Sequence, residues 1–145
     1  MQHISERIVL TIWIGGMWTV GYIVAPTLFA MLDDRALAGS IAGRLFTIMS
    51  FIGLFSAIFL LMTLAIRDGK QLMQAWRGWL LIAMLVIIVL GEFWLQPQMA
   101  ELRTNGITES EKARFGMLHG IASVLFLINS LSGLILLIFG LRKQA

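Results

Sequence analysis

The sequence of 145 residues contains no cysteine, which excludes disulfides, zinc–thiolate sites and thiol chemistry. It contains only two prolines, and charged residues make up 13% of the chain, against roughly a quarter in soluble globular domains. Hydrophobic residues make up 59%, and the mean hydropathy is +0.88. The scarcity of charge indicates that lipid, rather than water, surrounds most of the chain.

The balance of charge is basic, with a net charge of +3. In a membrane protein such basicity is typical of loops that contact anionic lipids of the inner leaflet. No basic patch is interleaved with aromatic residues, so no nucleic-acid partner is expected. The apolar run after Arg7 is longer than the core of a signal peptide and lacks a small-residue cleavage site, so it is predicted to be the first helix of the mature protein.

Four apolar runs stand out, at about residues 8–32, 45–66, 79–95 and 115–141. Each is near or above the roughly 17–25 residues that cross a bilayer. Backbone groups in lipid have no water to bond, so these runs are expected to be helices. The sequence therefore predicts an all-α fold, a four-helix integral membrane bundle formed by a single transmembrane domain over residues 1–145.

The loop charges predict the orientation through the positive-inside rule. The connection over residues 67–78 carries three basic residues and one acidic residue, and the C-terminal tail carries only basic ones. In the connections over residues 33–44 and 96–114, acidic and basic residues balance. Both termini are therefore predicted to be cytoplasmic, in a multi-pass protein of the bacterial inner membrane.

The longest connection, residues 96–114, contains two local signals. Asn105 followed by Gly106 predicts a turn. Thr108 and Glu111 have the spacing of a capping box, so the fourth helix is expected to begin before it enters the membrane. Both flanks of this connection are expected to be helical extensions.

Small residues predict where the helices pack. Glycine allows membrane helices to approach closely, so Gly15 and Gly16 of the stretch WIGGMW, and Gly43 of the second run, are predicted to be packing positions. Pro26 is predicted to kink the first helix near its outer end.

Titratable side chains inside apolar runs indicate a polar cluster, because such residues usually face the bundle interior or water. Glu92, near the end of the third run, and His119, near the start of the fourth, are predicted to lie at matching depth. Arg44 and Tyr22 fall on the same side of the membrane, and Ser123 shares the helix face of His119. We therefore expect a cluster at the outer ends of the helices, with Glu92 beside His119.

The cluster allows three interpretations: a structural network that holds the helices in register, a site for a small ligand, ion or proton, or unrelated interfacial residues. The favoured function is the binding or handling of a small ligand or ion. The alternative is an accessory or assembly subunit of a larger membrane complex, or a homo-oligomer, with a partner in the membrane besides the lipid bilayer. No nucleophile–base pair is evident, so enzyme activity is not indicated.

Haem and copper remain open as cofactors, with the metal ligands unknown. The nine methionines offer soft ligands for copper(I), although methionine is also common packing material in apolar proteins. Haem held by two histidines is not feasible, because His3 and His119 are predicted to lie at opposite membrane faces. The remaining haem arrangement has one histidine ligand, with methionine or an open position as the other.

Two stretches carry a family resemblance: GGMWTVGYIVAPTLFAMLDDRALAGSIAGRLF and the closing ARFGMLHGIASVLFLINSL. They resemble the small membrane-protein family called domain of unknown function 4149, which is related to the eukaryotic transmembrane protein 205 group. WLQPQMAEL resembles the segment that ends the third helix of that family. The resemblance spans most of the chain and implies a four-helix integral membrane protein, but it implies little about chemistry.

A more distant resemblance is to the CopD-like four-helix membrane bundles, which include copper-uptake proteins and a haem-pathway protoporphyrinogen oxidase. It is carried by WIGGMWTVGYIVAPTLF, with its tryptophan, paired glycines and later proline. The membrane histidine of those enzymes is missing here, because His3 precedes the first span. Neither haem ligation nor oxidase activity is therefore carried over.

Overall fold

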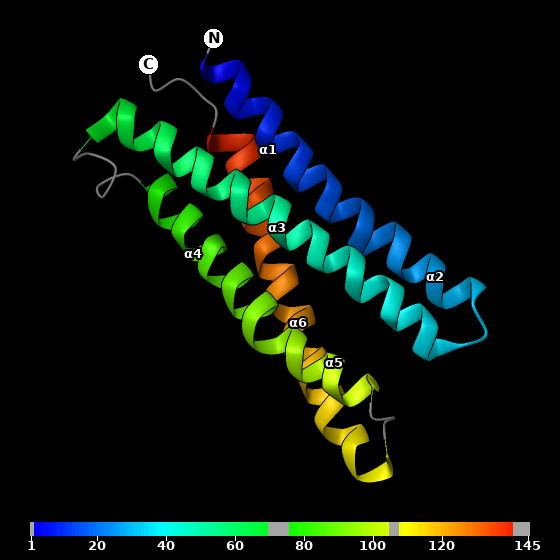
Figure 1. The fold of residues 1–145 in the computed structure, drawn as a ribbon. Coiled ribbons are helices and arrows are strands. Elements are labelled where there is room, and N and C mark those ends of the chain that lie inside the picture. The colour runs from blue at the N-terminus through cyan, green and yellow to red at the C-terminus, as the bar shows by residue number, and fades with distance from the viewer. Residues whose placement is uncertain (1, 70–75, 105–107, 141–145) are drawn as a thin grey trace.

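The computed structural model describes residues 2–69, 76–104 and 108–140, which form four long helical rods (Figure 1). The first rod comprises α1 (Gln2–Trp18), the π-helical segment η1 (Thr19–Val24) and α2 (Ala25–Met31), and the second rod is α3 (Arg35–Asp68). The third comprises α4 (Trp76–Leu90), the π-helical η3 (Gly91–Leu95) and α5 (Gln96–Thr104). The fourth comprises α6 (Glu109–Ile135) and the π-helical η4 (Leu136–Gly140).

Every rod is long and apolar enough to cross a membrane. The spans are Ile4–Met31, Arg35–Arg67, Trp76–Arg103 and Glu109–Phe139. The predicted all-α bundle of four membrane-spanning helices is therefore confirmed, and the chain is a multi-pass integral membrane protein. At about 1.5 Å per residue, rods of 28 to 33 residues are longer than the roughly 30 Å of hydrocarbon, so their ends extend beyond it.

The helices continue past the apolar runs, because capping rather than hydropathy decides where they begin. Residues 35–44 were expected in a connection but are helical: Asp34 accepts hydrogen bonds from the backbone N–H groups of Ala36 and Leu37, at 2.9 and 3.0 Å. The predicted capping box is confirmed, with the Thr108 N–H donating to the Glu111 carboxylate at 3.2 Å. The turn predicted at Asn105–Gly106 lies outside the described residues.

Each proline follows a π-helical segment. The segment η1 ends two residues before Pro26, and η3 ends two residues before Pro97. Proline lacks an N–H group and crowds the carbonyl four residues earlier, and the wider π turn makes room for it. At Pro26, where the sequence predicts a kink, the rod continues with a widened turn before the proline. At Pro97 the third helix likewise continues, to Thr104.

The rods pack in a ring in which α1 contacts α3, α3 contacts α4, α4 contacts α6, and α6 returns to α1. The core of this ring contains Trp13 and Met84, which are 1% and 0% exposed. Toward α2 and α5 the arrangement changes: α2 packs on α3, while α5 packs on both α6 and α3. Figure 1 shows the α2–α3 pair diverging from the α5–α6 pair at this end.

Candidate functional site

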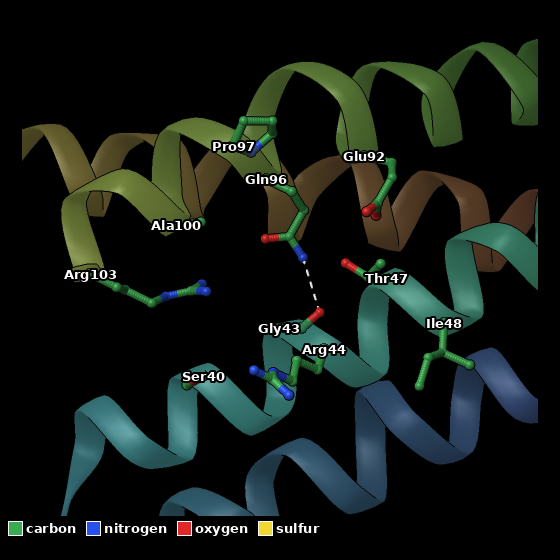
Figure 2. Close-up of a pocket in the computed structure, with 10 residues that line it drawn as sticks. All are labelled: Ser40, Gly43, Arg44, Thr47, Ile48, Glu92, Gln96, Pro97, Ala100 and Arg103. Carbon is green, nitrogen blue, oxygen red and sulfur yellow. Dashed lines mark hydrogen bonds between the residues drawn. The ribbon is translucent and has the colours of Figure 1, made fainter.

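A groove of about 600 Å³ opens between α3 and the η3–α5 part of the third rod (Figure 2). We call it the α3–α5 groove. Its polar lining residues are Ser40, Arg44 and Thr47 from α3, and Glu92, Gln96 and Arg103 from η3 and α5. Ile48, Pro97 and Ala100 supply apolar walls. The groove lies where the two helical pairs diverge, in the half of the bundle nearer the start of α3.

Glu92 enters the groove from η3, and its carboxylate points toward Thr47 of α3 (Figure 2). The Oε2 atom is buried, and it has no hydrogen-bond partner among the described residues. A buried polar atom without a partner is unfavourable, because it has lost its bonds to water without replacement. Oε2 of Glu92 is therefore a buried acceptor that no group in the described part of the chain satisfies.

Arg103 extends from α5 across the groove toward α3 (Figure 2). Its Nη1 atom lies 2.8 Å from the position that a Cβ on residue 43 would occupy, so the guanidinium fills the space left by the missing side chain of Gly43. The Nε atom is buried and lacks a hydrogen-bond partner in the described part of the chain. The guanidinium carbon lies 5.6 Å from the ring centre of Phe115, a cation–π contact with α6.

Gln96 lies between Glu92 and Arg103 along the groove (Figure 2). Its Nε2 atom donates a hydrogen bond to the carbonyl oxygen of Gly43 at 3.3 Å, which ties α5 to α3 (Figure 2). Arg44, the next residue on α3, is exposed at the edge of the groove. Gly43 thus has two roles, since its carbonyl anchors α5 and its missing side chain admits Arg103.

Three charged side chains therefore line one groove, and none of them is paired. Within residues 2–69, 76–104 and 108–140, no hydrogen bond or ion pair is formed by the side chain of Arg44, Glu92 or Arg103. Charged residues within membrane-spanning segments are usually paired with one another or with backbone groups. The arrangement can accept a ligand that brings an anionic group to the arginines and an N–H or O–H group to Glu92.

The structure brings together part of the cluster predicted from the sequence. Glu92 and Arg44 share the α3–α5 groove. His119 lies on α6 with an exposed side chain that stacks on Phe115, at 6.2 Å between ring centres. No hydrogen bond or ion pair joins Glu92 to His119 in the described structure. Phe115, on which His119 stacks, also contacts Arg103 of the groove.

The other two predicted members have partners elsewhere. Tyr22 of η1 donates its hydroxyl to Ser130 Oγ on α6 at 3.2 Å, which links the first and fourth rods. Ser123 donates to the carbonyl oxygen of His119 within the same helix, at 2.8 Å. Neither lines the α3–α5 groove. Among the described residues, no three histidine, aspartate or glutamate side chains gather as a set of metal ligands.

The predicted packing glycines differ in their surroundings. A Cβ on Gly16 would lie 2.7 Å from Met49 Cε, so Gly16 lets α1 approach α3 closely. Gly43 makes room for Arg103, as described above. At Gly15, no described heavy atom other than its chain neighbours and its own helix backbone lies within 4 Å of the corresponding position, and its carbonyl oxygen accepts a hydrogen bond from Thr19.

Sequence reasoning missed Gln96 and Arg103, because both were assigned to the connection after the third span. A signal was present: at about 100° per residue, Glu92, Gln96 and Arg103 fall within about 40° of one another on a continuous helix. Two features hide this helical periodicity. Hydropathy falls after Trp94, and Pro97 is typical of a helix end.

Comparison with known proteins gives one match. The model of the family described as Domain of unknown function (DUF4149) matches residues 8–108, more than half of the chain. No curated protein and no solved structure matches the chain. All polar residues of the α3–α5 groove lie inside the matched segment, whereas His119 and Ser123 lie outside it.

Proposed function

The chain belongs to the DUF4149 family, and we propose that this integral membrane protein binds a small ligand with an anionic group in the α3–α5 groove. The observation that carries the proposal is the set of unpaired charges, Arg44, Glu92 and Arg103, that line this one groove. The family description assigns no activity, so the proposal depends on the geometry of the site.

The energetics of buried charge support a ligand. Removing a charge from water costs several kcal/mol unless a partner compensates it. Arg103 and Glu92 each bury a polar atom without a partner, although Gln96 and Thr47 lie beside them in the groove. A bound anion would satisfy the guanidinium groups with charge-assisted hydrogen bonds, which are about twice as strong as neutral ones.

The composition of the lining supports an anionic group rather than a metal cation. Two arginines and one glutamate give the groove a formal charge of +1. Arginine binds carboxylate and phosphate groups through paired N–H donors, whereas it repels cations. Glu92 would then select among anions, because its carboxylate favours those that also carry a hydrogen-bond donor away from the anionic group.

The test is thermal unfolding of the purified protein in detergent, with glycerol phosphate as the probe and chloride at matched ionic strength as the reference. At ten times its Kd, a ligand that binds only the folded state contributes about 1.4 kcal/mol, which corresponds to a rise in Tm of about 4 °C for a chain of this size. We expect this rise for the wild type and its loss in Arg103→Gln and Arg44→Gln.

Arg114→Gln is the matched control. Arg114 is exposed, donates to Gln98 at 3.2 Å and does not line the groove, so this variant removes the same charge outside the site. It should retain the full rise in Tm. An equal rise in all four proteins, or no rise in the wild type, would refute the proposal.

A further inference from the structure

We propose that the occupant of the α3–α5 groove is the headgroup of a phospholipid that enters sideways from the bilayer. The phosphodiester would bind Arg103 and Arg44, and an ammonium or hydroxyl group beyond the phosphate would donate to Glu92. The inference rests on the proposed function, and it names the class of ligand that the site takes.

The position of the groove favours a ligand that comes from the membrane. Its lining residues lie within the spans Arg35–Arg67 and Trp76–Arg103 rather than in a connection between them. Glu92 precedes Arg103 by eleven residues, or about 16 Å of helix, and Arg103 is the last residue of its span, so the groove runs inward from the end of that span. A lipid headgroup is already concentrated at this depth.

The walls of the groove continue onto apolar surface. Ile48 lines the groove and is 54% exposed, and Phe51, one turn further along α3, is 42% exposed. On the other wall, Pro97 and Ala100 of α5 line the groove and are also exposed. Acyl chains attached to a bound headgroup would lie against these side chains, which already face the bilayer.

The two signs of charge select the headgroup. Two arginines suit a phosphodiester, because each guanidinium offers paired N–H donors and the phosphodiester carries one negative charge and two free oxygens. The unpartnered Oε2 of Glu92 requires an N–H or O–H donor, which the ammonium of phosphatidylethanolamine and the hydroxyls of phosphatidylglycerol supply. The quaternary ammonium of phosphatidylcholine has no such donor, so phosphatidylcholine should bind more weakly.

The experiment is native mass spectrometry of the full chain in detergent, titrated separately with phosphatidylethanolamine, phosphatidylglycerol and phosphatidylcholine of identical acyl chains. The wild type should bind one molecule of each of the first two at least fivefold more tightly than phosphatidylcholine. Glu92→Gln should reduce this preference to less than twofold, whereas Arg103→Gln and Arg44→Gln should weaken all three lipids by a similar factor of five or more.

Glu101→Gln and Arg114→Gln are the matched controls, because both residues are exposed and neither lines the groove. Arg44→Gln guards against an effect of misfolding, since the Arg44 side chain is exposed and forms no hydrogen bond or ion pair with the residues that the structure describes. Equal binding of the three lipids by the wild type, or a preference that survives Glu92→Gln, would overturn the lipid assignment. If that happened while glycerol phosphate still raised the Tm through Arg103 and Arg44, the groove would be a site for soluble anions and the proposed function would stand. If neither the lipid preference nor the rise in Tm with glycerol phosphate were observed, both the lipid assignment and the proposed function would be refuted.

Discussion

Arg103 of α5 rests its guanidinium against Gly43 of α3, with Nη1 2.8 Å from the position that a Cβ on residue 43 would occupy. The two residues are sixty positions apart in the sequence, and their contact joins the second rod to the third at the groove. The absence of one side chain therefore determines where a charged side chain of another helix can lie.

Gly43→Ala should abolish the binding of glycerol phosphate while lowering the stability of the protein only slightly. The added methyl group would occupy the place of the guanidinium, which can move because it is the end of a flexible side chain. We expect Tm to change by less than about 3 °C, equivalent to about 1 kcal/mol, while the Tm rise with glycerol phosphate is lost. Gly15→Ala is the control, since nothing lies within 4 Å of its added carbon. An unaltered response in Gly43→Ala would show that Arg103 does not need its observed position to bind the probe.

Gly53→Ala should destabilise the bundle directly. Its Cβ would lie 2.6 Å from Nε1 of Trp13, which is 1% exposed, and 2.9 Å from Cδ1 of Ile88. Overpacking of a buried position typically costs about 1–3 kcal/mol, because the neighbours cannot move without leaving their rotamers. Thermal unfolding in detergent should show a lower Tm, whereas Gly120→Ala, with no heavy atom within 4 Å, should not. A Tm for Gly53→Ala within 1 °C of wild type would contradict the packing.

Glu92→Gln and His119→Gln should have additive effects on stability. Their side chains share no hydrogen bond or ion pair, so a double-mutant cycle should give a coupling energy below about 0.5 kcal/mol. Tyr22→Phe with Ser130→Ala should instead give a larger coupling, because the Tyr22 hydroxyl donates to Ser130 Oγ. Unfolding free energies of the singles and doubles test both statements. A large coupling between Glu92 and His119 would restore the pair expected from the sequence.

The orientation in the membrane can be tested cleanly, because the chain has no cysteine that would react. Single cysteines at Ser110 and Ile66 report on opposite ends of the bundle, and both positions are exposed. If both termini are cytoplasmic, a membrane-impermeant thiol reagent added to intact cells should modify Ser110→Cys and leave Ile66→Cys unmodified until the membrane is permeabilised. The reverse pattern would invert the topology, and with it the leaflet that the α3–α5 groove faces.

Part of the candidate site was predictable because hydropathy detects charge in an apolar context. Glu92 stood out for that reason and lines the groove. Arg44 also lines it, but it was placed beside Glu92 because it precedes the second apolar run on the same side of the membrane. His119 stood out by the same criterion, yet it stacks on Phe115 on an exposed face of α6. Depth along the membrane can be estimated from position in a run, but the direction in which a side chain faces cannot, because it depends on the rotation of each helix about its axis.

The amino-acid sequence alone requires four membrane-crossing helices, because in lipid any apolar run of sufficient length must satisfy its own backbone hydrogen bonds, whatever its neighbours. It also determined local ends such as the Thr108–Glu111 capping box, whose atoms lie within one turn. Which charged side chains share a groove is set by the packing of the helices. That outcome depends on the register and rotation of α3 against α5, which are set by contacts between distant residues such as Gly43 with Arg103 and Gly53 with Trp13.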